Sequence, residues 1–235
     1  MSSDLPQRIQ VASYNIHRCI GNDGRFDAER TIEAISQLEA DIIALQELET
    51  SDDGGLDLLA HFRDEIGMFA VAGPTVYRHD SHYGNALLCR QEPKDIRLLD
   101  ISVPHREPRG AISCRLACGK RTISVIATHF GLLPSERRYQ AELLLSSMEH
   151  KEEEISILMG DINEWFMWGR PLRRLQRHFN TTDSPPRTFP ARFPLFALDR
   201  IWVEPGTHLE QLSVVDTPLT RQASDHLPLT ALLRL

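Results

Sequence analysis

Short runs of apolar residues recur along the whole chain, separated by polar or turn-forming segments. Their short length and their content of β-branched residues favour strands over helices. The eight clearest runs are "RIQVASY", "DIIALQ", "GNALLCR", "GAISCRL", "TISVIAT", "ISILMG", "ALDRIWV" and "HLPLTALLRL".

Three segments between these runs have the spacing of amphipathic helices. In "DAERTIEAISQLEA", Ile32, Ile35 and Leu38 share one helical face, and Asp27 stands where an N-cap is expected. "LDLLAHFRDEIG" ends in a glycine, which is typical of a helix C-terminus. "SERRYQAELLLSSM" follows a proline, and Ser135 is its expected cap.

Helices and strands alternate early in the chain, but strands follow strands between residues 69 and 129. This order predicts an α/β (α+β) fold with a mixed sheet rather than a doubly wound parallel sheet. No repeat or long linker divides the chain, so we expect residues 1–235 to form a single domain. The segment 181–196, "TTDSPPRTFPARFPLF", contains four prolines and is expected to be a loop.

Composition and charge exclude several classes of protein. With 41% hydrophobic and 25% charged residues, the 235-residue chain has an ordinary globular composition. A net charge of −7 argues against a protein that coats nucleic acid by charge alone, although it leaves room for a local basic groove. The chain has no secretory signal and no apolar run of the ~20 residues that span a bilayer. We therefore expect a cytoplasmic protein, and a monomer.

The cysteine pattern does not indicate a zinc site. Only Cys114 and Cys118 are close together, with C-x3-C spacing, and no second pair completes a ligand set. Cys19 and Cys89 are isolated. Reduced thiols are expected in a cytoplasmic protein.

Several of the apolar runs end in polar residues that can bind a cation or a phosphate. These residues are Asn15, Glu47, His129, Asp161 and Asn163. Each alone has an ordinary explanation as a turn residue, a solvated strand end or a core histidine. Strand ends that meet at one edge of a sheet, however, form the crevice where such folds hold ligands. Together the residues therefore predict a site.

Three further polar residues lie toward the C-terminus. "ALDRIW" places Asp199 inside an apolar run, where a buried carboxylate requires a hydrogen-bonding partner. "ASDHLPL" places Asp225 and His226 directly before the last strand. The alternative explanation is that Asp225 caps a turn and His226 packs beside it.

This set of carboxylates, amides and imidazoles restricts the chemistry. The chain has no matched thiol pairs and lacks the G-x-S-x-G, H-E-x-x-H and P-loop motifs. Hard oxygen ligands select magnesium or manganese. Such an ion beside histidine and asparagine donors suits the attack of water on a phosphate ester.

Eight short motifs occur in order over more than 200 residues. They are "SYNIH", "ALQE", "YGNALL", "REPRGA", "ATHFG", "MGDIN", "LDRIW" and "SDHLP". With these motifs the chain resembles the endonuclease/exonuclease/phosphatase superfamily, which includes pancreatic deoxyribonuclease, apurinic/apyrimidinic endonucleases, neutral sphingomyelinases and inositol polyphosphate 5-phosphatases. The resemblance implies a four-layer α/β/β/α sandwich, with two packed mixed β-sheets flanked by helices and the site at one end.

The resemblance also implies roles for the polar residues. Glu47 would be the main ligand of Mg²⁺ (or Mn²⁺), with Asn15 and Asp225 completing the metal site. Asp161 and Asn163 would lie against the scissile phosphate.

The two histidines and Asp199 have implied roles as well. His226, held by Asp199, would contact the phosphate or the attacking water, and His129 would donate to the phosphate from the opposite side. The implied reaction is a single-step in-line hydrolysis, in which either Asp161 or the His226–Asp199 pair takes the proton from water. The implied phosphate-binding residues are Asn15, Asn163, His129 and His226.

Two segments bear on the substrate without deciding it. "GRPLRRLQRHF" puts its arginines on one helical face, which either tracks a phosphate backbone or is a solvated surface. The opposite stripe of that helix is Leu172, Leu175 and Phe179, and the arginines are Arg170, Arg173, Arg174 and Arg177. Trp165, Phe166 and Trp168 either stack on a base, touch a lipid or pack their own loop.

Three functions are therefore compatible with the sequence. The favoured one is a metal-dependent nuclease that acts on DNA or RNA. The second is a phosphodiesterase or phosphatase for a phospholipid or a small phosphorylated headgroup. The third, a binding module without turnover, is disfavoured because every expected catalytic position is occupied.

Overall fold

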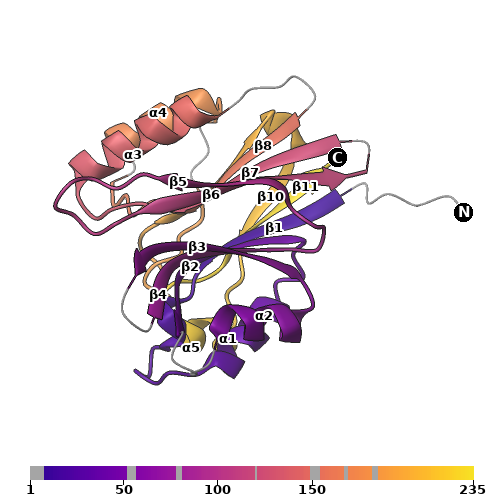
Figure 1. Ribbon diagram of the computed structural model, residues 1–235, viewed down its shortest axis with the longest axis vertical. Coiled ribbons are helices and arrows are strands. Elements are labelled where there is room, and N and C mark those ends of the chain that lie inside the picture. Colours follow the sequence, from indigo (N-terminus) through magenta and orange to yellow (C-terminus); the bar gives the residue numbers. More distant parts are fainter. Residues whose placement is uncertain are drawn as a thin grey trace, which may run out of the picture.

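Two β-sheets stacked face to face form the centre of the molecule, and helices cover both outer faces (Figure 1). This computed structural model describes residues 8–51, 57–77, 81–119, 121–148, 154–166, 169–181 and 185–235. The six-stranded sheet has the order β10-β11-β1-β2-β4-β3, and the five-stranded sheet has the order β5-β6-β7-β8-β9. Both sheets are mixed, because β1 with β2 and β7 with β8 are parallel pairs. The predicted four-layer sandwich is confirmed.

The strands and helices have the following bounds within the described ranges. The strands are β1 (Arg8–Asn15), β2 (Ile42–Ser51), β3 (Phe69–Tyr77), β4 (Ser81–Cys89), β5 (Lys94–Asp100), β6 (Gly110–Cys118), β7 (Arg121–His129), β8 (Glu154–Asp161), β9 (Asp199–Glu204), β10 (Leu209–Val214) and β11 (Leu229–Arg234). The helices are α1 (Ala28–Ser36), α2 (Leu58–Ile66), α3 (Pro134–Ser147), α4 (Arg170–His178) and α5 (Pro218–Ala223), with 3-10 turns at His17–Cys19 and Gly206–His208.

The central strands are apolar on both faces because each contributes to two cores. In β2, Ile42 and Ala44 lie in the core between the sheets, whereas Ile43 and Leu45 pack with residues of α1 and α2. The five-stranded sheet buries its outer face in a third core with α3 and α4. Since successive side chains of a strand point to opposite faces, burial on both sides requires a nearly continuous apolar run.

The helix boundaries agree with the sequence at two ends and differ at a third. Asp27 caps α1 through its side chain, as predicted, and α2 ends at Gly67 in the left-handed conformation. The predicted cap of α3 is wrong, because α3 begins one residue before Ser135 and its N-cap is Leu133. The Leu133 N–H donates to Glu136 Oε2 at 2.8 Å, so a first-turn carboxylate stabilises this helix end.

The proline-rich segment is a loop where it is described, at residues 181 and 185–196. A single bridge between Phe189 and Phe196 closes it on itself. Among the described residues, no helix is long and apolar enough to cross a membrane.

Candidate functional site

Three neighbouring strands of the five-stranded sheet bring polar side chains to one end of the sandwich. His129 at the end of β7 pairs in register with Asp161 at the end of β8. Asp161 pairs on its other side with Asp199, the first residue of β9. The strand pairing therefore places an imidazole and two carboxylates side by side.

The six-stranded sheet adds Asn15 and Glu47 to this end. Asn15 closes β1, and its Nδ2 donates to Glu47 Oε1 and to Asp161 Oδ2, both at 3.1 Å. One amide thus joins carboxylates from both sheets. Glu47 lies at a register shift of β2 and has φ of 60°, so a β-bulge turns its side chain out of the ladder.

Asp161 is both a turn residue and the centre of the site. Its Oδ1 accepts from the Asn163 N–H at 2.8 Å, which closes the turn after β8. Its Oδ2 faces Asn15 and lies 3.6 Å from His129 Nε2 and 3.7 Å from His226 Nε2. Burial raises the pKa of Asp161 to about 6, with Asp199 adding to the rise and His226 opposing it.

His226 forms a fully buried pair with Asp199. Its Nδ1 lies 2.8 Å from Asp199 Oδ2, which also accepts from Thr188 Oγ1 at 2.5 Å. The carboxylate fixes the tautomer, so that Nε2 points toward Asp161. Burial by itself lowers the pKa of His226, but the two carboxylates outweigh burial and raise this pKa to about 10.

His129 has the opposite electrostatic environment. Burial and the neighbouring Arg109 guanidinium hold its pKa well below the usual range. Arg109 Nη1 lies 3.1 Å from His129 Nδ1, so Nδ1 accepts and Nε2 carries the proton that faces Asp161. Asn163 Nδ2 donates to the Phe130 carbonyl at 3.0 Å. The same Nδ2 lies 3.0 Å from His129 Nε2, and with the proton on Nε2 this contact is not a hydrogen bond, because both nitrogens are then donors.

Asp225 lies beside the end of β1, where it is half-buried. Its Oδ1 is 3.9 Å from His17 Nδ1. The preceding Ser224 donates from Oγ to the Asn15 carbonyl at 2.7 Å and fastens this loop to β1. All eight residues predicted for the site therefore lie at one end of the sandwich, joined directly or through one neighbour.

Of the three side chains predicted to bind the metal, two fit a hard divalent ion as they stand and the third, Asn15, does not. Glu47 and Asp225 are the half-buried carboxylates of the site, and such oxygens suit magnesium or manganese. Asn15 turns Nδ2 toward Glu47 and engages Oδ1 with the His17 N–H at 3.0 Å. Direct ligation by Asn15 therefore requires its amide to rotate.

A second group of possible ligands is better explained as the His–Asp pair. One donor atom each of Asp161, Asp199 and His226 lies within 4.8 Å of the others. A metal ligand must be a neutral imidazole, whereas the carboxylates of Asp199 and Asp161 raise the pKa of His226 and favour its protonated form. The hydrogen bond to Asp199 also occupies Nδ1.

Several side chains that support the site were not singled out from the sequence. Arg109 lies in the motif "REPRGA", but its contact with His129 depends on the pairing of β6 with β7. Thr188 lies in the proline-rich loop and gives no local signal. Phe189, in the same loop, packs against His226 with ring centroids 4.8 Å apart.

The aromatic residues after Asn163 extend this wall. Trp165 packs edge-on against Phe189 and Phe196, at 5.5 and 4.9 Å between ring centroids, and remains 39% exposed. Phe166 is 54% exposed. Trp168 lies outside the described residues. Trp165 thus packs the loop while one side of its ring stays open to a ligand.

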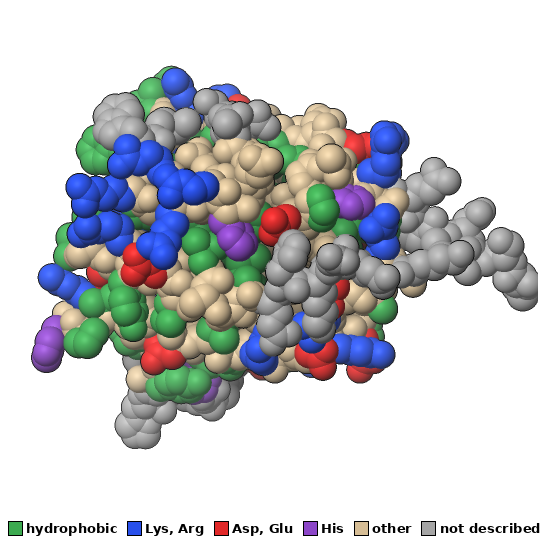
Figure 2. Space-filling model, turned by 90° about the horizontal axis from the view of Figure 1, so that it is seen from above, with side chains coloured by type: hydrophobic (Ala, Val, Ile, Leu, Met, Phe, Trp, Pro, Cys, Tyr) green, Lys and Arg blue, Asp and Glu red, His purple; other side chains and the backbone are tan. Residues whose placement is uncertain are grey.

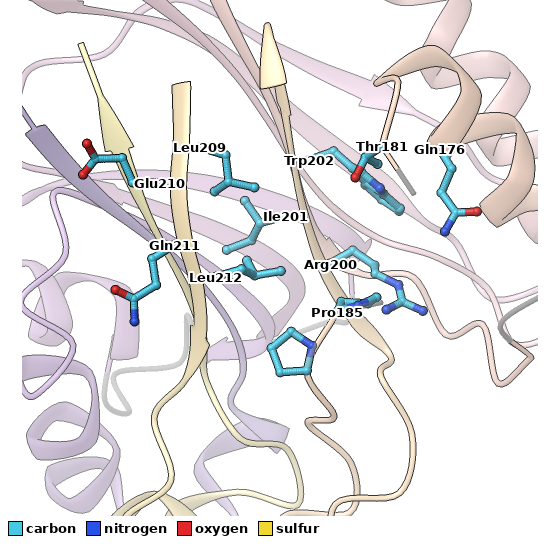
Figure 3. Close-up of a pocket in the computed structure, with 11 residues that line it drawn as sticks. Gln176, Thr181, Pro185, Arg200, Ile201, Trp202, Leu209, Glu210, Gln211 and Leu212 are labelled. Atoms are coloured by element: carbon cyan, nitrogen blue, oxygen red, sulfur yellow. The ribbon is translucent and has the colours of Figure 1, made fainter. Parts of the chain in front are cut away.

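A separate hollow lies at the open edge between the two sheets, where β9 and β10 are the edge strands (Figure 3). It has a volume of about 220 Å³ and is lined by Arg200, Trp202 and Leu212, among others. None of the eight predicted site residues lines this hollow. It is therefore distinct from the site at the strand ends.

The comparisons with known proteins agree with this fold. The chain belongs to the Endonuclease/Exonuclease/phosphatase family, whose sequence model matches residues 12–226. Proteins of this family are metal-dependent phosphoesterases, so the chain is assigned to that class of hydrolase.

Individual relatives cover nearly the whole chain. The uncharacterized protein YbhP of Escherichia coli (strain K12) is 29% identical over 245 residues, which cover 95% of each chain. An endonuclease/exonuclease/phosphatase from Beutenbergia cavernae has a TM-score of 0.79 at 19% identity, over 97% of this chain and 72% of that one. A mannosyl-6-phosphatase of Bacteroides thetaiotaomicron has a TM-score of 0.74 at 17% identity, over 96% and 99%. These two structural similarities concern the fold alone.

Proposed function

We propose that this protein is a magnesium- or manganese-dependent phosphodiesterase that cleaves DNA or RNA by a single in-line attack of water. The observation that carries the proposal is the position of Asp161 Oδ2. This oxygen accepts from Asn15 and has the Nε2 atoms of His129 and His226 at 3.6 and 3.7 Å. A carboxylate between an amide and two imidazoles can accept a proton while its neighbours hold a phosphate.

The geometry supports separate roles for the two histidines. His226 donates from Nδ1 to Asp199, and its Nε2–H faces the space beside Asp161, where it can stabilise a phosphoryl oxygen as a cation. His129 is held neutral by Arg109 and offers its Nε2–H from the other side. Because both neighbours are donors, Asp161 is the group that takes the proton from water.

A divalent ion at the half-buried carboxylates would complete the site. Glu47 and Asp225 would hold it, with Asn15 as a third ligand once its amide turns. When bound, the ion neutralises charge on the phosphoryl oxygens and on the leaving alkoxide. Asn163, fixed by the Phe130 carbonyl, would position the phosphate next to it.

Two surface features support different substrates. Arg170 and Arg173, exposed in the first turn of α4, favour a polyanion such as nucleic acid. The alternative is a phospholipid or a small phosphorylated headgroup, and it is favoured by Phe193 and Leu195, which are 77% and 58% exposed in the loop that packs against His226.

The test is a substrate panel with magnesium present. It contains plasmid DNA, abasic DNA, RNA, phospholipid vesicles and bis-p-nitrophenyl phosphate. We expect cleavage of nucleic acid and of the generic diester, and a loss on the order of 10² to 10⁴ in turnover for Asp161→Asn. Asp64→Asn, on an exposed aspartate, is the matched control and should leave both rates unchanged.

The melting temperature separates catalysis from folding. Asp161→Asn should unfold close to the temperature of the unaltered chain, since the amide keeps the volume of the carboxylate. Cleavage of vesicles without cleavage of any polymer would replace the nuclease by the lipid alternative. If Asp161→Asn lost folding and activity together, Asp161 would be a structural residue.

A further inference from the structure

A hollow of about 410 Å³ lies between α3 and α4, beside the segment that follows Asn163. Its walls include Arg138 of α3, Arg170 and Arg173 of α4, and Phe166 of the segment before α4. This volume lies in the range of about 300 to 1,000 Å³ that small-ligand sites have in proteins. The hollow is therefore large enough for a phosphate together with part of an attached group.

The three arginines of the hollow are exposed, and none of them pairs with a carboxylate in the described part of the chain. The neighbouring Arg174 differs, because it forms an ion pair with Glu142. Figure 2 shows Lys and Arg side chains gathered on this face, over α3 and α4. Like charges held together, with no carboxylate partner among the described residues, indicate a site for an anion on a chain of net charge −7.

The acidic residue of the hollow, Glu164, does not cancel this charge. Its Oε2 lies 3.2 Å from Arg137 Nε in a buried ion pair, and its Oε1 accepts from the Phe166 N–H at 3.2 Å. Gly169 makes room for this arrangement, since a Cβ there would lie 2.4 Å from the Glu164 carboxyl carbon. The Arg137–Glu164 pair thus forms a neutral, rigid floor beneath the exposed arginines.

The hollow adjoins the hydrolytic site along the chain. Glu164 directly follows Asn163, and Phe166 is three residues from it, which limits the distance between their Cα atoms to about 11 Å. The intervening Trp165 packs on Phe189, which packs on His226. The hollow is therefore joined to His226 by a chain of side-chain contacts through Trp165 and Phe189.

We infer that this hollow binds a second phosphate of a single-stranded nucleic acid, next to the phosphate that is cleaved, with the attached base against Phe166. Guanidinium groups bind phosphate oxygens through paired N–H donors, and an exposed aromatic ring accepts any base by stacking. This inference rests on the proposed function for the identity of the cleaved bond, but not for the binding itself. It assigns the substrate class, a strand with at least two phosphates.

Binding is measured without turnover by using the full chain with Asp161→Asn and magnesium present. The probe is a fluorescently labelled single-stranded oligonucleotide. We expect Arg170→Ala with Arg173→Ala to weaken binding by about tenfold or more, and Phe166→Ala by roughly fivefold or more. Arg177→Ala is the matched control, because Arg177 is exposed on α4 but does not line the hollow, and it should change binding by less than about twofold.

A second measurement separates this inference from the proposed function. With Asp161 intact, the arginine variants should keep the rate on bis-p-nitrophenyl phosphate and raise KM for the oligonucleotide. The chain could fail to hydrolyse any diester while the variants of the hollow still bind the oligonucleotide more weakly than Arg177→Ala does. That result would reject the proposed function and still support the binding site. Equal binding by the arginine variants and Arg177→Ala would overturn the inference. The inference would also be overturned if the arginine variants kept their affinity for the oligonucleotide and lost their binding to phosphatidylglycerol vesicles.

Discussion

At the scale of single residues, the site depends on how Asp199 is held. Its Oδ2 accepts from both His226 Nδ1 and Thr188 Oγ1, while its Oδ1 has no hydrogen-bond partner among the described residues. A buried carboxylate with so few donors is costly, and each remaining bond carries more of its stabilisation. Thr188 therefore positions the His–Asp pair without touching the substrate.

Replacing Thr188 by valine tests this positioning role. Thr188→Val keeps the shape of the side chain but removes the donor to Asp199, so the free energy of unfolding should fall by about 1 to 3 kcal/mol. The value of kcat on bis-p-nitrophenyl phosphate should fall about tenfold, because His226 is less well oriented. Urea unfolding and steady-state kinetics measure the two effects.

Thr31→Val is the control for this prediction. Thr31 is also fully buried in α1, its Oγ1 donates to the Asp27 carbonyl at 3.2 Å, and it is not one of the eight site residues. Thr31→Val should lower the free energy of unfolding about as much as Thr188→Val does, while kcat stays unchanged. A comparable fall of kcat in both variants would show that Thr188 acts only through stability.

That these eight polar residues lie together could be predicted from the sequence, but their supporting contacts could not. Asp161 and Asn163 are visible because polar residues directly after a buried strand are conspicuous. Arg109 and Thr188 act on His129 and Asp199 across separations of 20 and 11 residues. Thr188 has no local pattern, and the motif that contains Arg109 does not show which side chain it contacts. Such contacts follow from sheet order and loop path, which no short window of sequence contains.

At the scale of elements, the strands without a clear apolar run all lie at sheet edges, although the edge strand β9 is buried and does have such a run. All eight apolar runs are strands, but β3, β5 and β10 are not among them. Each of these three lies at the edge of its sheet. An edge strand buries fewer side chains, as in β5, where all residues but one are exposed, so its apolar pattern is weak.

The pairing of β7 with β8 gives a prediction at this scale. Gly160 has φ of 151°, and a Cβ there would lie 1.9 Å from the Thr128 carbonyl oxygen. Gly160→Ala must therefore separate the two strands next to His129 and Asp161. We expect a loss of more than about 3 kcal/mol in the free energy of unfolding, measured in denaturant, together with loss of activity.

Gly24→Ala is the matched comparison, because Gly24 also has positive φ, at 73°, but nothing lies within 4 Å of an added Cβ. Gly24→Ala should lower the free energy of unfolding only by the backbone strain, about 1 to 2 kcal/mol, and should leave activity unchanged. If Gly160→Ala were no worse than Gly24→Ala, the two strands would not be held together at this point.

At the scale of the whole molecule, charge is unevenly distributed. The chain carries a net charge of −7, yet the face over α3 and α4 is rich in Lys and Arg (Figure 2). A polyanion is repelled by the net charge of the molecule and attracted by this face. The net charge argues against a protein that coats nucleic acid. It does not reveal the local excess of positive charge, because that excess arises where α3 packs on α4.

This asymmetry predicts different salt responses for two substrates of one site. If three arginines contact phosphates of a single strand, the affinity should fall with a logarithmic slope of about −2, or roughly twentyfold between 50 and 200 mM salt. The ratio kcat/KM for an oligonucleotide should fall accordingly, whereas hydrolysis of bis-p-nitrophenyl phosphate, which lacks a second phosphate, should change little. With Arg170→Ala and Arg173→Ala combined, the slope for the oligonucleotide should become shallower, because fewer counterions are released per strand bound. Parallel salt curves for both substrates would mean that this basic face plays no part in substrate binding.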